Sequence, residues 1–460
     1  MGVGLDKHIK EAYHWLGKHY NPGDEIYVFG FSRGAFTARS LVGMIHTTGL
    51  LKLNDLDDSR SRKLVGLTYN NYREGNSKPV DADLTFDAGN KLPIHFLGVW
   101  DTVGALGVPD HMHGLSIFDD PWNYRFLDVE LTSCIKHARH ALALDEKRAS
   151  FMPTLWNENS LAEHPDAKQI WFTGVHCDVG GGYQERGLSD GPLRWMIEQA
   201  QDVGLVFRDG IIKEKDWHKE VKPDPWGVRH DSTTGVFAHL PTQPRNVPNF
   251  QSQKQNEVLH QSALDRHGRP TIDERDYWRT HNLDIDDCAD MEIDAKQPWN
   301  ATGIYLEANG QYTFTATGKW ANGKDETSPA GVGFKPDFSA SPSVQFRHIT
   351  EIIFGKIGWC YRRLTRDKHA ELFGIRREGG SPWGALIGAI SNGDNPERNG
   401  TPAPHSVFEI GNAVTFPNGV RQPSKSGYLY CFMNDAWMLY DNNQGVVHLR
   451  IERIALPPNS

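Results

Sequence analysis

Three side chains with complementary chemistry, Ser32, Asp101 and His176, each follow a short apolar run of the chain. These apolar runs cover residues 25–29, 94–100 and 169–175. Buried runs of this kind, separated by helical segments, are typical of a parallel sheet covered on both faces. Because the carboxyl ends of parallel strands meet at one edge of a sheet, we expect the three side chains to converge there. A hydroxyl, an imidazole and a carboxylate in contact could perform acyl transfer.

The surroundings of Ser32 predict a tight turn from a strand into a helix. The segment Gly30-Phe31-Ser32-Arg33-Gly34 follows an apolar run and opens a helix-like stretch, residues 35–42. Such a turn strains the serine backbone, and glycines two residues on either side let the backbones pass closely. The hydroxyl would stand at the positive end of the helix, where the backbone N–H of Arg33 could bind an oxyanion.

A second copy of the same spacing serves as an internal comparison. It covers residues 187–191 and follows the polar stretch Gln184-Glu185-Arg186 instead of a strand. We therefore expect Ser189 to lie in a loop or at a helix cap, with Asp190 and Pro192 beginning that helix.

The order serine, acid, histidine along the chain is the α/β-hydrolase order. In this hypothesis His176 is the general base, and Asp101 fixes the tautomer of the imidazole and stabilises imidazolium. Asp178 is the reserve acid. Simpler roles stay open, since an aspartate at a strand end also caps helices and a histidine beside glycines also satisfies loops. His137 and His140 have helical spacing and are interpreted as helix-packing residues.

Composition excludes several classes of protein. The chain has 460 residues and a formal net charge of −9, without a compact basic run, which argues against nucleic-acid binding. No segment approaches the ~20 apolar residues of a membrane span. The first residues lack the apolar core of a signal peptide, so we expect synthesis and folding in the cytoplasm. The five scattered cysteines favour neither a disulfide scaffold nor a zinc site.

Changes in sequence texture predict two domains. Residues 1–295 are expected to form the α/β domain, with an irregular insert from about 205 to 295. From residue 296 to 460, short alternating strands separated by Gly and Asn turns predict an all-β sandwich.

Four separated segments resemble one family, the α/β-hydrolase domain of type VI secretion phospholipase effectors of the first Tle group. These segments are residues 29–39, 98–104, 143–146 and 172–183. The resemblance implies a Ser-Asp-His lipase acting on acyl esters of glycerophospholipids, mapped onto Ser32, Asp101 and His176. It also implies export into target cells, with a secretion apparatus or an immunity protein as partners.

One departure from the family pattern concerns the start of the chain. Family members carry several strands before the nucleophile turn, including an Asp-Gly-Thr motif near the oxyanion hole, whereas one helix and one strand precede Ser32 here. The sheet is therefore expected to lack its opening strands and the second oxyanion donor. An N-terminally truncated product is the favoured interpretation, and a separate polypeptide that completes the sheet is the alternative.

The C-terminal run from Asn434 to Gly445 has an oxygen-rich spacing suited to calcium. With residues 318–320 and 384–388, it resembles the small calcium-dependent, galactose-binding bacterial lectin of jelly-roll type. That resemblance implies that Asp435, Asn442 and Asn443 give side-chain oxygens to Ca²⁺, and that Leu439 and a residue near Gly323 give carbonyl oxygens. A metal-free hairpin turn rich in Asn and Asp is the alternative.

The sequence thus favours a serine ester hydrolase of phospholipase A type, with a β-sandwich that docks on a membrane or a glycan. Two alternatives stay open: a catalytically silent, calcium-dependent carbohydrate-binding protein, and a carbohydrate esterase that acts on acetylated glycans.

Overall fold

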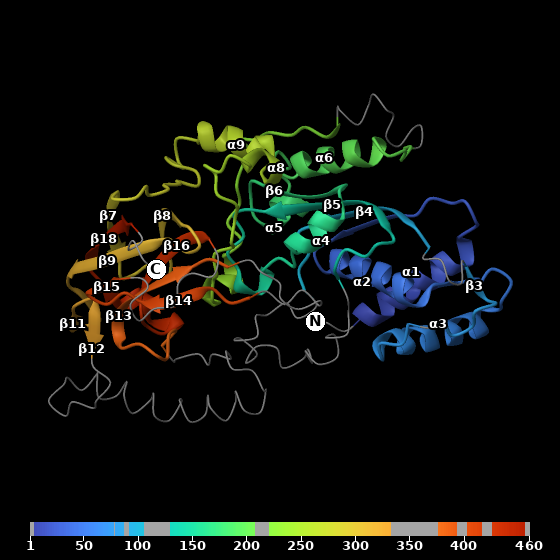
Figure 1. The fold of residues 1–460 in the computed structure, drawn as a ribbon, viewed down its shortest axis with the longest axis horizontal. Helices are drawn as coiled ribbons and strands as arrows, with labels where there is room; N and C mark the ends of the chain where they lie inside the picture. The colour runs from blue at the N-terminus through green and yellow to red at the C-terminus, as the bar shows by residue number, and fades with distance from the viewer. Residues whose placement is uncertain are drawn as a thin grey trace.

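The computed structural model divides the chain into a parallel-sheet region, from α1 to α9, and an antiparallel region, from β7 to β18 (Figure 1). It describes residues 4–77, 79–86, 92–104, 129–207, 220–332, 376–392, 403–415 and 426–455. Within these ranges, no helix combines the length and apolar character needed to cross a membrane.

Four parallel strands form the central sheet of the first region, in the order β1-β4-β5-β6. They are β1 (Tyr27–Phe31), β4 (Ile94–Trp100), β5 (Ile135–Ala143) and β6 (Ala167–Phe172). The register pairs Phe31 with Trp100 and Trp100 with Ala141, so the carboxyl ends of three neighbouring strands are level. The residue that follows each strand therefore emerges at the same edge.

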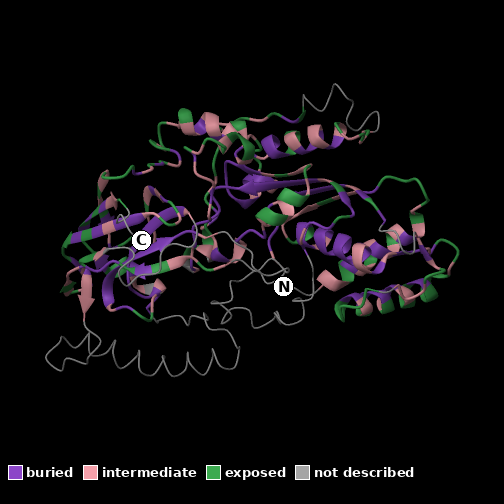
Figure 2. Ribbon diagram, viewed as in Figure 1, coloured by how far each residue is buried: buried purple, intermediate pink, exposed green. Residues whose placement is uncertain are grey.

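Helices cover both faces of this sheet. On one face α2 (Arg33–Thr48) packs on β1 and β4, backed by α1 (Leu5–His19) and α3 (Asp58–Arg73). On the other face α6 (Asp190–Gln201) packs on β4 and β5 (Figure 1). The two central strands, β4 and β5, are buried along most of their length (Figure 2), whereas no residue of the edge strand β1 is fully buried. Burial on two faces explains the nearly continuous apolar run of β4, while β5 and β6 also contain charged and polar residues.

The remaining elements of this region are short. They are β2 (Leu50–Leu51), β3 (Thr85–Phe86), η3 (Ala149–Phe151), α4 (Glu158–Glu163), α5 (His176–Gly180), η4 (Gly235–His239), α8 (Gln255–Val258) and α9 (Gln261–Gly268). Between residues 205 and 287, the predicted irregular stretch contains only short helices among its described residues, and its loops pack on both regions. Its predicted end at about residue 295 was too late, because residues 288–294 form the strand β7, which pairs with β18 in the antiparallel region.

Two antiparallel sheets face each other in the second region. One has the order β12-β13-β16-β8, with β14 paired to β13, and the other has the order β15-β9-β18-β7. Phe314 and Ile451 from the second sheet share one buried core with Leu386 and Leu429 from the first sheet. A third, small sheet joins β11, β10 and β17.

The strands of this region, with the short helix η5, are β7 (Cys288–Asp294), β8 (Asn300–Leu306), β9 (Gln311–Gly318), β10 (Trp320–Asn322), β11 (Asp325–Thr327), β12 (Ala330–Val332), β13 (Trp383–Ile390), β14 (Ser406–Glu409), β15 (Ala413–Thr415), β16 (Gly427–Met433), η5 (Trp437–Asn442), β17 (Asn443–Gln444) and β18 (Val446–Ile454). An all-β C-terminal region was predicted, and the structure confirms it at this level.

The helical interpretation of His137 and His140 was wrong, because both lie in β5. Ala, Leu and Arg in this segment favour a helix locally, but pairing with β4 and β6 on either side overrides that preference. The strand β1 lies at the edge of the described sheet and pairs only with β4 there.

Candidate active site

Ser32 lies in the turn between β1 and α2 with a strained backbone, φ 58° and ψ −125°. Its N–H donates to the carbonyl of Trp100, 3.0 Å away, which ties the turn to the neighbouring strand. A Cβ on Gly30 would stand 2.4 Å from the carbonyl oxygen of Gly34, so residue 30 must be glycine. A Cβ on Gly34, in contrast, would meet nothing within 4 Å. The predicted steric need for glycine therefore applies to one side of the turn only.

The imidazole of His176 connects Ser32 to Asp101. Its Nε2 lies 2.8 Å from the Ser32 hydroxyl oxygen, and its Nδ1 lies 2.6 Å from Oδ2 of Asp101. Asp101 is fully buried and His176 is 3% exposed, so water competes little for these hydrogen bonds. The structure brings together the three residues that were predicted to converge.

Asp101 is also held by Arg245, a residue that the sequence analysis did not single out. The guanidinium donates to both carboxylate oxygens, at 2.6 and 2.9 Å, and to the carbonyls of Ala143 and Phe151. Burial raises the pKa of Asp101, but the charge of Arg245, together with hydrogen bonds from His176 and Arg245, lowers it overall below its ordinary value. This carboxylate is therefore ionised at neutral pH.

Aromatic rings and a second carboxylate fix the His176 ring and its loop. The ring centroid of Phe31 lies 4.6 Å from that of His176, and the centroid of Phe151 lies 4.9 Å away. A Cβ on Gly180 would collide with the Phe31 ring at 1.9 Å, so the glycine run beside His176 makes room for this ring. The backbone N–H of His176 donates to Glu146 at 3.2 Å.

The reserve acid, Asp178, is engaged elsewhere. Its Oδ1 lies 2.6 Å from Nδ1 of His230, and its Oδ2 accepts from the backbone N–H groups of Val175 and His230. The structure thus places Asp101, and not Asp178, at His176.

Arg33 and Ser189, the two remaining predicted positions of the N-terminal half, lie at the starts of two helices. Arg33 is the first residue of α2, directly after Ser32, at the positive end of a helix of 16 residues. Ser189 is the N-cap residue of α6, and its hydroxyl donates to the carbonyl of Arg186.

His140 contacts Thr102, the residue that follows the acid Asp101, and its role differs from that of a base. Its Nε2 accepts from the backbone N–H of Thr102, at 3.2 Å, and its Nδ1 lies 3.1 Å from Oε1 of Gln169. Burial and the nearby charge of Arg39 lower the pKa of His140 to about 3, which keeps the ring neutral.

Two of the predicted calcium ligands lie together in the antiparallel region. Asp435 and Asn443 are fully buried, and both neighbour Asn322: its Nδ2 donates to Asp435 at 2.5 Å, and its backbone is in register with Asn443. The Oδ1 of Asn443 is buried without a hydrogen-bond partner. Asn442 is exposed, its carbonyl accepts from the N–H of Gly323, and Leu439 lies in η5.

The sequence contains little that could have predicted the contact of Arg245 with Asp101 or the contact of Asn322 with Asp435. Arg245 lies in the irregular stretch, 144 residues from Asp101, where no periodicity or motif marks it. Glu146 was visible only as the last residue of the family-like segment 143–146. In the part of the chain that the structure describes, no group of three or more His, Cys, Asp and Glu residues suited to a metal occurs.

Comparisons with known proteins add the following. A protein of Saccharomyces cerevisiae, itself uncharacterized, is 34% identical over 164 residues, which is 33% of this chain and 21% of the yeast protein. The chain therefore spans about a fifth of the length of that relative.

Three solved structures show similarity at low TM-scores. They are the N-terminal domain of EclA, a PllA-like lectin (17% identity, 36% of this chain, 94% of that chain, TM-score 0.21), an uncharacterized protein from Pseudomonas aeruginosa (20%, 48%, 31%, 0.28) and the Tle1 effector bound to the VgrG spike of the type 6 secretion system (23%, 40%, 30%, 0.22). These scores are too low to carry an argument about the fold.

The family comparison concerns the N-terminal part of the chain. Residues 1–199 match the family model described as the T6SS phospholipase effector Tle1-like catalytic domain. This range contains Ser32, Asp101 and His176. The family resemblance inferred from the sequence is therefore confirmed for residues 1–199, which match the catalytic domain of Tle1-like phospholipase effectors of the type VI secretion system.

Proposed function

We propose that the parallel-sheet region is a serine ester hydrolase of phospholipase A type. The observation that carries the proposal is the hydrogen-bonded chain from Ser32 through His176 to Asp101, at 2.8 and 2.6 Å. The match of residues 1–199 to a phospholipase effector domain supports glycerophospholipid acyl esters as the substrate class.

In the proposed mechanism Ser32 Oγ attacks the ester carbonyl carbon while Nε2 of His176 accepts the hydroxyl proton. Asp101 holds Nδ1–H and stabilises the imidazolium. The N–H of Arg33 donates to the oxyanion of the tetrahedral intermediate. His176 then returns its proton to the leaving lysophospholipid oxygen, and water, deprotonated by His176, releases the fatty acid from Ser32.

The test is hydrolysis of phosphatidylglycerol and phosphatidylethanolamine vesicles, measured as fatty-acid release. Ser32→Ala should lower the rate by at least ~10³-fold, because the nucleophile is lost. Ser189→Ala is the matched control, since Ser189 occupies the same sequence pattern and only donates to the Arg186 carbonyl. Equal rates for Ser32→Ala and the unmodified chain would exclude the proposal. Activity on acetylated glycans and not on vesicles would favour a carbohydrate esterase.

The family match also supports, as part of the proposal, delivery into target cells by a type VI secretion apparatus. An immunity protein that blocks the site belongs to the same hypothesis. Delivery into target cells and inhibition by an immunity protein are inferred from the family match of residues 1–199, and both are proposals for the whole protein.

For the antiparallel region we propose calcium binding at Asp435 and Asn443, which would serve docking to a glycan or membrane surface. The observation that favours it is the buried, unpartnered Oδ1 of Asn443 close to a buried carboxylate, since hard oxygen donors suit Ca²⁺. Calorimetric titration of the EDTA-treated protein should give calcium binding, lost in Asp435→Asn. A chain that binds no calcium would favour the metal-free turn, and calcium-dependent glycan binding without any hydrolysis would favour a silent carbohydrate-binding protein.

A further inference from the structure

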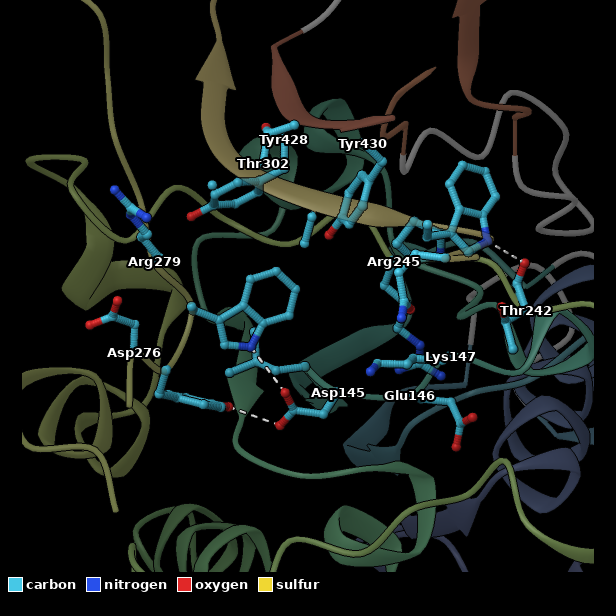
Figure 3. A pocket seen from close by; sticks show the side chains of 18 of the residues that line it. Asp145, Glu146, Lys147, Thr242, Arg245, Asp276, Arg279, Thr302, Tyr428 and Tyr430 are labelled. Carbon is cyan, nitrogen blue, oxygen red and sulfur yellow. Dashed lines mark hydrogen bonds between the residues drawn. The ribbon is translucent and has the colours of Figure 1, made fainter. Parts of the chain in front are cut away.

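A cavity of about 600 Å³ lies between the parallel-sheet region and the antiparallel region, and two of its lining residues, Glu146 and Arg245, also contact His176 and Asp101 at the candidate active site. Its walls come from the residues after β5, from the loop after α9 and from the facing strands β8 and β16 (Figure 3). Neither Ser32 nor His176 lines it. Its volume falls within the ~300–1,000 Å³ of small-molecule sites.

Aromatic rings held in fixed positions face this cavity. Trp278 has φ 52°, a left-handed conformation that a bulky residue rarely adopts, and its indole N–H donates to Asp145 at 3.0 Å. The hydroxyl of Tyr277 donates to the same carboxylate at 2.9 Å (Figure 3). On the opposite side, the indole N–H of Trp299 donates to the carbonyl of Thr242 at 2.8 Å. These hydrogen bonds fix both indoles before any ligand arrives. The guanidinium of Arg377, 4.1 Å from the Trp299 ring centroid, covers one face of that ring, so a ligand can contact only its other face.

The hydroxyl of a largely buried tyrosine points into the same space. Tyr430, on β16, is 5% exposed, and Figure 3 shows its hydroxyl directed into the cavity. Among the described residues, this hydroxyl has no hydrogen-bond partner, unlike that of Tyr428, which lies 2.6 Å from the hydroxyl of Thr280. Burial raises the pKa of Tyr430, so the hydroxyl stays protonated and can donate. The hydroxyl oxygen itself is accessible from the cavity, so a ligand oxygen could accept its hydrogen bond there.

The charges around the cavity balance. Its lining contains four cationic residues, Lys147, Arg229, Arg245 and Arg279, and four anionic residues, Asp145, Glu146, Glu274 and Asp276. Several are already paired: Arg229 with Glu274 at 2.8 Å, Arg245 with Asp101 at 2.6 Å, and Glu146 with Arg148 at 2.8 Å. An excess of positive charge would favour a phosphate, and an excess of negative charge would favour a quaternary ammonium. This cavity has neither.

We propose that the cavity binds a neutral, hydroxyl-rich ring, a mono- or disaccharide. The apolar faces of the sugar would lie against Trp278 and Trp299, and a sugar oxygen would accept from the Tyr430 hydroxyl. At the rim, Asp276 would accept from sugar hydroxyls, and Lys147 and Arg279 would donate to them. The site is separate from the Ser32 hydroxyl and from the loop that contains Asp435, so it requires neither ester hydrolysis nor calcium.

The test is calorimetric titration of the full chain in EDTA with galactose, glucose, N-acetylglucosamine, lactose and cellobiose. At least one of these sugars should bind, with quenching of tryptophan fluorescence. Trp278→Ala should weaken that binding by ~10-fold or more, and Tyr430→Phe, which keeps the ring, should weaken it by a few-fold. Trp15→Ala is the matched control, since Trp15 is 61% exposed on α1.

Four results would overturn the proposal. The first is the absence of binding by every neutral sugar in EDTA. The second is binding that requires calcium and is lost in Asp435→Asn. The third is an affinity unchanged in Tyr430→Phe, a substitution that removes one oxygen and so tests the site even where Trp278→Ala fails to fold. Stronger binding of glucose 6-phosphate or choline than of every neutral sugar would contradict the assigned ligand class. None of these outcomes depends on fatty-acid release, so they are independent of the test of Ser32.

Discussion

Two histidine–aspartate pairs lie close together in this protein, and the distance from Nδ1 to the carboxylate oxygen is the same in both. Nδ1 of His176 is 2.6 Å from Asp101, and Nδ1 of His230 is 2.6 Å from Asp178. The difference lies at the other ring nitrogen. Nε2 of His176 meets the Ser32 hydroxyl at 2.8 Å, whereas Nε2 of His230 lies 3.5 Å from Glu185.

The surroundings of the His230–Asp178 pair also differ from those of the His176–Asp101 pair, and they indicate a structural role. Tyr183 stacks on the His230 ring at 3.7 Å, and Asp178 accepts from two backbone N–H groups of its own loops. These contacts hold the loop that carries His176. A histidine–aspartate contact is therefore no sign of catalysis by itself; a nucleophile at the second nitrogen distinguishes the first pair.

The largest expected effect separates the two acids. Asp101→Asn should lower kcat for ester hydrolysis by roughly 10⁴-fold, because Nδ1 of His176 loses the acceptor that fixes its tautomer. Asp178→Asn should lower kcat by less than about tenfold and should lower the Tm instead, because it weakens a buried loop anchor. The measurements are steady-state hydrolysis of p-nitrophenyl esters and thermal unfolding of both variants. Equal losses of kcat in the two folded variants would erase the proposed distinction between the pairs.

A smaller effect is expected from a substitution in the turn at Ser32, which contacts only the His176–Asp101 pair. Gly30→Ala places a Cβ 2.4 Å from a backbone oxygen and must displace Ser32, so labelling of Ser32 by a fluorophosphonate should slow by roughly 10²-fold. Gly34→Ala is the matched control, since its Cβ meets nothing within 4 Å. The measurement is the rate at which the fluorophosphonate labels the two folded variants, Gly30→Ala and Gly34→Ala. Normal labelling of Gly30→Ala would mean that the turn relaxes without moving the hydroxyl.

The contact between His176 and Asp101 could be predicted because the apolar runs in the sequence indicate where the strands end. Apolar runs that stop at Ser32, Asp101 and near His176 fix where those residues emerge once the strands are parallel and level. His137 and His140 show the limit of this reasoning, since the identity of a strand flanked on both sides is decided by its neighbours and not by its own residues. No local pattern marks Arg245 or Trp278 either. Their positions depend on how an irregular stretch folds back over the sheet.

The smallest expected effect concerns Arg245, which contacts the first pair and has no counterpart at the second. Among the described residues, no lysine or arginine lies within ion-pair distance of Asp178. Arg245 lowers the pKa of Asp101, so in the folded chain this carboxylate stabilises the fold at neutral pH. That contribution is lost only as the pH falls below the ordinary value of about 3.9.

Arg245 also holds the carboxylate that accepts from Nδ1 of His176, through one hydrogen bond to each carboxylate oxygen. Arg245→Gln removes the charge and this two-point contact, so kcat for a p-nitrophenyl ester should fall by roughly tenfold with KM unchanged, because the acid is positioned less firmly. Arg245→Lys, which keeps a charge, should lose less. The measurement is kcat and KM at neutral pH, with the folded fraction of each variant determined alongside. A fall in kcat that the loss of folded protein explains entirely would mean that Arg245 has only a structural role.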